Sequence, residues 1–325
     1  MLLRGIEGFG LAQRLQTQRL LTLSEDLPLV AVAVDARERI QRVLPEVVSF
    51  GGHGLVTLER ARLLVGRVRG VRFPEGLAEQ TKLTVYLGRR ERAAGGPAFL
   101  AVVEALRRHG VAGATVLLGV DGTAVGFRRR ARFFGRNTGV PLMVISVGTG
   151  EAIARALPEL GVLLERPLVT LERVRVCKRD GRRLATPGRL PDADPSGLGV
   201  WQKLMVYAGE EARHGGHPLY VQLVRRLREA GASGATVLRG MWGYHGDHAP
   251  HGDRLLALRR RVPVVTVLVD TPSRMRQWFA IVDELTDETG LVTSEIVPAF
   301  RATGPGAQQG GLRLASWSAG ELPAG

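Results

Sequence analysis

An internal repeat is the feature of this 325-residue chain that most constrains its fold. KLTVYLGR at 82–89 returns as KLMVYAGE at 203–210, and GATVLLGVDG at 113–122 returns as GATVLRGMWG at 234–243. VPLMVISVG at 140–148 and PLVTLE at 167–172 likewise return as VPVVTVLVD at 262–270 and GLVTSE at 290–295. Four matching segments in one order indicate a duplicated domain of roughly 95 residues, a size at which one hydrophobic core is normal.

The N-terminal part matches a third copy that lacks the opening strand and the first helix. LLRGIEGFG at 2–10 matches the segment at 237–245, and GLVTLE at 54–59 matches PLVTLE. Nothing before Met1 supplies the KLTVY strand or its helix. A fragment without that opening strand would leave the last strand of its sheet unpaired. We therefore expect either that the true start lies upstream or that this half borrows an edge from elsewhere.

The apolar periodicity predicts the same elements in each copy. Leu83, Val85 and Leu87 alternate with polar residues, which is typical of a strand. Phe99, Val102, Val103 and Leu106 have the i, i+3, i+4, i+7 spacing of an amphipathic helix. The predicted order is β-α-β-β-α-β, an α+β ferredoxin-like plait with two helices on one face of a four-stranded antiparallel sheet. Its last strand is expected to run unbroken over 168–176, 55–64 and 291–300.

We therefore divide the chain into three units and a tail. The first unit, residues 1–65, is truncated; the second, 82–178, and the third, 203–301, are complete. Residues 302–325 are rich in Gly, Ala, Ser and Gln without any period, and we expect them to be disordered.

Composition limits the cellular location and the kind of partner that we expect for the protein. No apolar run approaches the ~18 residues that span a bilayer, and the N-terminus lacks the pattern of an export signal. A single cysteine excludes an internal disulfide framework, and together these observations favour the cytoplasm. The net charge of +14 suits an anionic partner. No nucleophile–base–acid set is evident, so nothing in the sequence supports an enzyme.

The repeated unit resembles the PII signalling superfamily in its β-α-β-β-α-β order and in the long loop between its second and third strands. The segments GATVLRG, RLLTLSEDLP at 19–28, VPVVTVLVD and GLVTLE look like the uncharacterised PII-like family called domain of unknown function 190. The resemblance implies a compact trimer that binds adenine nucleotides or other small effectors between units. It also implies that the second-to-third-strand loop, the T-loop, contacts a target protein such as a transporter or an enzyme.

A glycine corner closes the second strand of every copy and is the first candidate ligand site. It consists of Gly5 and Gly8, Gly119 and Gly122, and Gly240 and Gly243, preceded by Arg4 and Arg239 in two copies. Glycine lets the backbone approach a ligand closely. We expect backbone N–H groups and these arginines to bind an anionic effector at the base of the T-loop, although a G-x-x-G pattern is also common at strand exits.

The second T-loop is a candidate contact for an anionic partner. It carries Arg128, Arg129, Arg130, Arg132 and Arg136, interleaved with three phenylalanines. Clustered arginine with aromatic residues suits phosphate or nucleic acid, although a solvated basic loop would look the same.

The third T-loop is a candidate metal site, because it holds His245, His248 and His251. Imidazole groups at short spacing can bind Zn²⁺ or another divalent ion. Neither other copy has these histidines, which indicates a specialised loop.

The sequence thus favours a PII-like regulatory protein that binds a small anionic effector, for example an adenine nucleotide, between its units. We expect the three units to pack as an intramolecular pseudo-trimer, with a homo-oligomer of chains as the alternative. The alternatives are a divalent-metal protein acting through the histidine loop and a nucleic-acid-binding protein acting through the arginine loop. The sequence names no cofactor.

Overall fold

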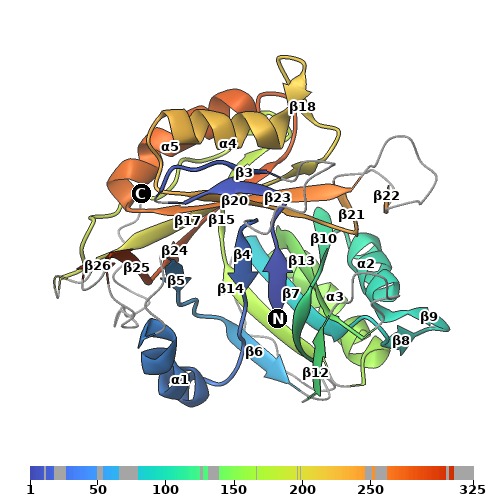
Figure 1. Ribbon diagram of the computed structural model, residues 1–325. Helices are drawn as coiled ribbons and strands as arrows, with labels where there is room; N and C mark the ends of the chain where they lie inside the picture. Colours follow the sequence, from blue (N-terminus) through green and yellow to red (C-terminus); the bar gives the residue numbers. More distant parts are fainter. Residues whose placement is uncertain are drawn as a thin grey trace.

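The computed structural model is of mixed α/β type, with several antiparallel sheets (Figure 1). It describes residues 1–10, 12–17, 27–49, 54–65, 80–124, 127–130, 139–165, 167–195, 197, 199–245, 251–252, 262–304 and 307–310. Within these ranges there are five helices. None of the five is long and apolar enough to cross a membrane.

The second and third units contain the same six elements in the same order. In the second unit these are β7 (Gln80–Gly88), α2 (Ala98–Arg108), β10 (Gly113–Leu118), β13 (Pro141–Thr149), α3 (Gly150–Leu163) and β14 (Leu168–Arg173). In the third they are β17 (Trp201–Gly209), α4 (Leu219–Glu229), β20 (Ala235–Arg239), β23 (Pro263–Asp270), α5 (Pro272–Leu285) and β24 (Leu291–Val297). The strands lie in the orders β10-β13-β7-β14 and β20-β23-β17-β24, with all neighbours antiparallel.

Each complete unit has its own helix-covered core. The predicted apolar face of α2 is buried at Val102, Val103 and Leu106, which pack with strand residues such as Val85. The corresponding core of the third unit includes Trp278 from α5. Short hairpins precede both first helices: β8 (Arg92–Ala93) with β9 (Gly96–Pro97), and β18 (Arg213–His214) with β19 (His217–Pro218). In Figure 1, α2 and α3 accompany one sheet and α4 and α5 the other.

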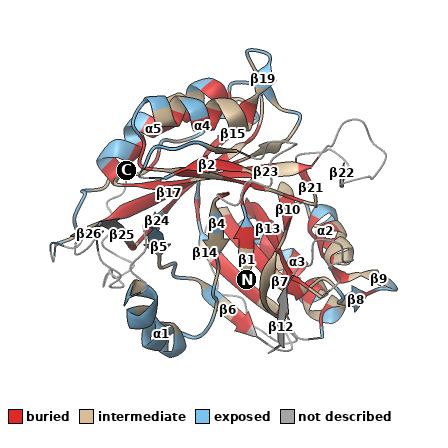
Figure 2. Cartoon of the chain, in the orientation of Figure 1, coloured by how far each residue is buried: buried red, intermediate tan, exposed pale blue. Residues whose placement is uncertain are grey.

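The first unit has the remaining elements of the pattern but no core of this kind. It contains β1 (Leu2–Arg4), β2 (Glu7–Phe9), β3 (Gln16–Thr17), β4 (Leu29–Ala31), α1 (Arg37–Ser49), β5 (Leu55–Thr57) and β6 (Arg62–Val65). α1 has no buried residue, stands apart from the other helices in Figure 1 and is largely exposed in Figure 2.

The strand after each glycine corner pairs with a different unit. β11 (Asp121–Ala124) of the second unit joins β1 of the first, and β21 (Trp242–His245) of the third joins β10 of the second. β2 of the first unit completes the cycle by joining β20 of the third. Each of these strands also opens a hairpin into its T-loop, with β3, β12 (Phe127–Arg130) or β22 (His251–Gly252).

The last strand of each unit is divided in two, contrary to the unbroken strand that we predicted. β14 stays in the second unit, but β15 (Arg175–Arg179) pairs with β24 of the third. β6 of the first unit pairs with β14, and β25 (Ala299–Gly304) of the third pairs with β5. The alternation of Val174 and Val176 is correct for extended backbone, but periodicity does not reveal which sheet a strand joins.

The two kinds of exchange run in opposite directions and close a ring of three units. Every pair of units is therefore joined by two reciprocal strand additions. The resulting sheets have the orders β22-β21-β10-β13-β7-β14-β6 and β16-β15-β24-β17-β23-β20-β2-β3, where β16 is Arg182–Arg183. The first unit instead has two short sheets, β12-β11-β1-β4 and β26-β25-β5. β5 pairs with β25 of the third unit, but β14 and β24 receive the same kind of addition from β6 and β15, so this pairing does not replace the missing opening strand.

The C-terminal segment begins with regular structure where we expected disorder. β25 continues to Gly304 and pairs with β26 (Ala307–Gly310). The ladder with β5 gives this hairpin a template that composition alone does not show. Residues 305–306 and 311–325 lie outside the described part of the chain.

Candidate functional sites in a carboxylate–lysine cluster and an inter-unit cleft

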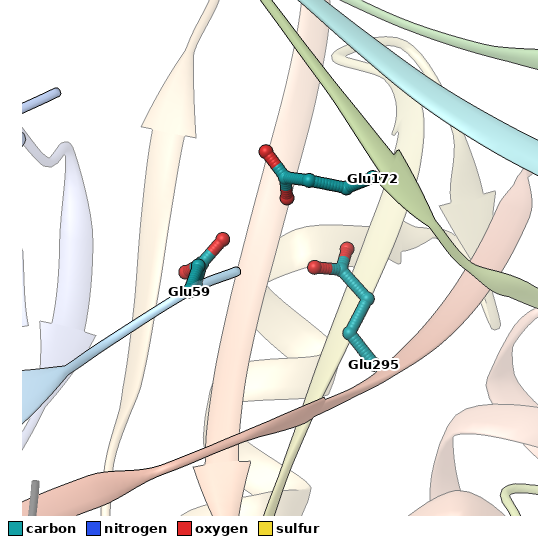
Figure 3. A group of neighbouring side chains, drawn as sticks. All are labelled: Glu59, Glu172 and Glu295. Carbon is teal, nitrogen blue, oxygen red and sulfur yellow. The ribbon is translucent and has the colours of Figure 1, made fainter. Parts of the chain in front are cut away.

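Three glutamates from equivalent positions of the three units meet in the middle of the ring. Glu59, Glu172 and Glu295 each end the V-T-x-E segment that follows the second helix of their unit. One carboxylate oxygen of each lies within 4.8 Å of the others, and Figure 3 shows the three side chains converging. We call these residues, together with Lys82 and Lys203, the axial cluster.

The two lysines come from the opening strands of the complete units. Lys82 of β7 lies opposite Glu172 in the ladder, and Lys203 of β17 lies opposite Glu295. Lys82 Nζ is 2.5 Å from Oε2 of Glu172, 2.8 Å from Oε2 of Glu295 and 3.5 Å from Oε2 of Glu59. Lys203 Nζ is 3.0 Å from Oε2 of Glu295 and 2.6 Å from Oε2 of Glu59. The first unit contributes a glutamate without a lysine.

The axial cluster is buried, so its charges interact strongly. The Lys82 and Glu295 side chains are each only 5% exposed, whereas that of Glu59 is 31% exposed and forms the open side. Burial raises the pKa of Glu172, and the neighbouring Glu59 and Glu295 add to this against the attraction of Lys82. Burial also opposes the charge of Glu59, but Lys203 and Lys82 together hold its pKa below the usual range.

The axial cluster has more acceptors than donors. Three carboxylates face two ammonium groups, and Oε1 of Glu295 has no hydrogen-bond donor in the parts of the chain that the structure describes. Carboxylate oxygens at these separations could hold a hard cation. However, Oε2 of every glutamate already contacts an ammonium group, so a metal ion would have to displace a lysine.

A cleft of about 410 Å³ lies between the second and third units and is the other candidate site. The second unit contributes the end of α2 with the start of β10, and the third contributes the ends of β17 and β21. The lining includes Arg107, Arg179, Tyr207, Gly243 and Tyr244, together with the acidic residues Asp180 and Glu211. This volume falls in the range of small-molecule sites.

Arg179, one of the residues that line the cleft, has an unsatisfied donor. Its Nε is buried, and no hydrogen-bond acceptor for it is found among the described residues. Leaving a buried donor unpaired costs free energy, most of all for a charged group. An anion in the cleft would supply the acceptor.

Comparison with known proteins places the chain in a family. Residues 1–63, 80–176 and 201–299 each match the family model DUF190, described as "Uncharacterized ACR". The chain belongs to the DUF190 family. It is similar to the UPF0166 protein of Aquifex aeolicus (strain VF5), with 30% identity over 95 residues. That match covers 29% of this chain and 88% of the relative, so the relative corresponds to a single DUF190 unit.

The glycine corners of this DUF190 chain lie at the junctions between units, close to other protein atoms. A Cβ on Gly243 would be 2.2 Å from the carbonyl oxygen of Ala114, and one on Gly8 would be 2.5 Å from that of Ala235. At Gly5, Gly119, Gly122 and Gly240 the nearest atoms, at 2.6–2.9 Å, belong to Pro28, Pro141, Met1 and Pro263 respectively. The close approach that these glycines allow is therefore to neighbouring strands and prolines.

Only one of the predicted corner residues, Gly243, is among those lining the cleft. Arg4 is exposed, and Arg239 forms an ion pair with Glu210. Arg4 and Arg239 are thus not among the residues lining this cleft, and an anion site at each glycine corner stays a prediction.

The predicted loop sites fall on residues whose side chains the structure does not describe. Arg128, Arg129 and Arg130 belong to β12, while Arg132 and Arg136 lie outside the described residues. His245 ends β21 and His251 begins β22, whereas His248 lies outside the described residues. The arginine and histidine sites therefore stay predictions.

Sequence reasoning missed the axial cluster, although a signal was present. A lysine stands at the start of both apolar opening strands, and a glutamate ends all three V-T-x-E segments. Charged residues that recur at one register position of buried strands need partners, because an unpaired buried charge is costly. Their partners in the other units could not be named without knowing that the three units close a ring.

Proposed function

We propose that this protein is a PII-like regulatory protein that binds a small anionic effector in the cleft between its second and third units. The observation that carries this proposal is that Arg179, whose buried Nε has no acceptor among the described residues, lines a cleft of about 410 Å³. The effector would accept a hydrogen bond from this guanidinium group. Arg107, which forms an ion pair with Glu104, provides a second guanidinium group in the same lining.

The arrangement of strands supports the PII-like part of the proposal. The order β10-β13-β7-β14, with two helices packed on it, is what a ferredoxin-like β-α-β-β-α-β plait requires. The cyclic exchange of strands resembles three subunits of a compact trimer joined into one chain. We infer that the ring is an intramolecular pseudo-trimer with its effector site between units.

The position of the cleft offers a physical route from effector to partner. Gly243 and Tyr244 line the cleft and also belong to β21, the first strand of the third T-loop hairpin. Tyr244 donates a hydrogen bond of 2.9 Å from its hydroxyl to the carbonyl oxygen of Val111, across the two units. An effector that shifts this contact would move the base of the T-loop, which we propose presents the signal to a target protein.

A thermal-shift screen with a matched pair of variants tests the proposal. We expect one of ATP, ADP, cyclic AMP, a cyclic dinucleotide or pyrophosphate to raise the melting temperature in proportion to its concentration. Arg179→Gln should abolish the shift, whereas Arg173→Gln, an exposed position outside the lining, should preserve it. A shift that survives Arg179→Gln, or no shift with any of these anions, would contradict the proposed site.

A further inference from the structure

The two short sheets of the first unit resemble one sheet with its middle strand missing. In the second unit β7 lies between β13 and β14, and in the third β17 lies between β23 and β24. The equivalents in the first unit are β4 and β5, which are edge strands of separate sheets. Within the described residues no strand pairs with the free edge of either one. Open strand edges are templates for a further strand.

Apolar side chains beside this gap are exposed, although their counterparts are buried. Leu29 of β4 is 58% exposed, while the equivalent Leu142 of β13 is 1% exposed. Val47 of α1 is 39% exposed, while the equivalent Leu160 of α3 is 1% exposed. Val43 is likewise 47% exposed, while the equivalent Ala156 is buried; Leu55 is 40% exposed and its equivalent, Leu168, is partly buried. An exposed apolar patch next to open strand edges is typical of an interaction site.

The axial cluster has three glutamates but two lysines, and the position of a third lysine would fall in the gap between β4 and β5. The shortest contacts of each lysine are to the glutamate opposite it in its own unit and to the glutamate of the next unit. Lys82 contacts Glu172 and Glu295, with a longer contact of 3.5 Å to Glu59, and Lys203 contacts Glu295 and Glu59. By analogy, a lysine placed opposite Glu59 on an opening strand of the first unit would contact both Glu59 and Glu172. That position belongs to a strand between β4 and β5.

We propose that the gap between β4 and β5 is a docking site for a β-strand that carries a lysine opposite Glu59 and is followed by an amphipathic helix. The strand would pair with both free edges, as β7 does with β13 and β14. Its lysine would supply the third ammonium group of the axial cluster. The helix would cover the exposed face that includes Val43 and Val47. This is strand addition, with main-chain hydrogen bonds giving affinity and side chains giving specificity.

The ion-pair contacts of Glu172 agree with a third lysine in the axial cluster. Among the described residues its lysine partner is Lys82 alone, whereas Glu295 and Glu59 each contact both lysines. Burial raises the pKa of Glu172, and the attraction of Lys82 together with the smaller attraction of Lys203 does not offset it. A second ammonium group would complete the pairing that the other two glutamates already have.

Other occupants satisfy only part of these features. A metal ion bound by the three carboxylates would balance charge but would leave Leu29 and the strand edges uncovered. A second copy of the chain cannot donate its own lysine strands without unfolding, because β7 and β17 are each paired on both edges. The donor is therefore a segment that has the pattern of residues 82–108 and is not already held in a sheet.

The test appends a copy of residues 80–114 directly before Met1 of the full chain. Gly5 aligns with Gly119, so Met1 takes the place of Thr115 and the appended helix reaches β1 through the native connection. We expect the amides of β4 and β5 to exchange at least about tenfold more slowly with solvent, and the melting temperature to rise by more than about 5 °C. No added protection in β4 and β5 would overturn the proposal.

The matched control carries Lys82→Met in the appended copy only. We expect it to retain strand pairing but to give at most about half of the gain in melting temperature, because the third lysine is still absent. An equal gain would overturn the role of the lysine. If the extended chain is insoluble, a synthetic peptide of residues 80–109 titrated into the unextended protein replaces it, with the Lys82→Met peptide as control. Stabilisation of the unextended protein by Na⁺ or Mn²⁺ that Glu59→Gln abolishes, together with no peptide binding, would assign a metal ion instead.

Discussion

The two helices α3 and α1 occupy equivalent positions in the second and first units, yet their surroundings differ completely. α3 buries Ile153, Leu157 and Leu160 against strands of its own unit, whereas no residue of α1 is buried. Both helices have the same apolar spacing. The spacing specifies the helix, but the core requires an opening strand and helix on which it can pack. The complete units are stabilised by burial, and the first unit is attached mainly by strands shared with its neighbours.

The largest loss of stability is expected from substitutions in the axial cluster, where lysines of the complete units contact Glu59 of the first unit. Lys82→Met removes the lysine of Glu172 and leaves a buried carboxylate unpaired, which should cost about 3–5 kcal/mol of unfolding free energy. Lys203→Met should cost less, because Glu59 and Glu295 keep their contacts with Lys82. Urea denaturation of both variants measures the difference. Equal losses would show that the two lysines are not distinguished in the way that the geometry implies.

The packing difference between α3 and α1 can be tested with one matched pair of variants. Leu157→Ala in α3 removes a side chain that is 0% exposed and should cost about 3 kcal/mol. Leu44→Ala at the equivalent position of α1, which is partly exposed, should cost less than about 1 kcal/mol. Denaturant midpoints for the two proteins provide the comparison. A large loss at Leu44 would mean that α1 has a packing partner beyond the described residues.

The junction between the two complete units should be sensitive to a single methyl group. Gly243→Ala places a Cβ 2.2 Å from the carbonyl oxygen of Ala114, so backbone must move, at a cost of about 1–3 kcal/mol. Gly10→Ala is the control, because a Cβ there meets nothing within 4 Å. Differential scanning calorimetry reports both. If the two variants melt alike, the close contact between the units is not required for stability.

The junction between the first and third units should depend on pH. Burial of Glu7 in β2 raises its pKa from 4.5 to about 7, and Tyr220 of α4 lies within its electrostatic influence. The folded state therefore binds this proton more tightly than the unfolded state, so the contribution of Glu7 to stability is greatest below pH 4.5 and is lost as pH rises to about 7. Glu7→Gln should recover about 2 kcal/mol at pH 8 and almost nothing at pH 4. Melting curves across this range give the result, and a variant with an unchanged pH profile would refute it.

Local structure was predictable from this sequence to the extent that it depends on neighbouring residues. The strand at Leu83–Leu87, the helix face at Val102 and Leu106 and the order of elements all follow from periodicity and are confirmed. The division of the last strand at Val174 was not predictable, because alternation is the same in one sheet or in two. The glycine corners were recognised as close approaches, but their partners across the junction were not.

The axial cluster depended on information that no single unit contains. Glu59, Glu172 and Glu295 come from segments more than a hundred residues apart, and they meet because the strand exchanges close a ring. Lys82 and Lys203 were visible as repeated charges in apolar strands. Their pairing across units is a consequence of the ring and could not be read from any one copy.

The reciprocal strand additions have a consequence for how such a molecule diverges. In an assembly of identical subunits, one substitution alters every junction at once. Here the two sides of each junction are different stretches of one chain. A residue such as Tyr244 or Arg179 can therefore change at one junction while the residues at the other two stay the same. Independent change of this kind would give three T-loops with different residues, as this chain has. The strand pairing between units would keep the overall arrangement unchanged.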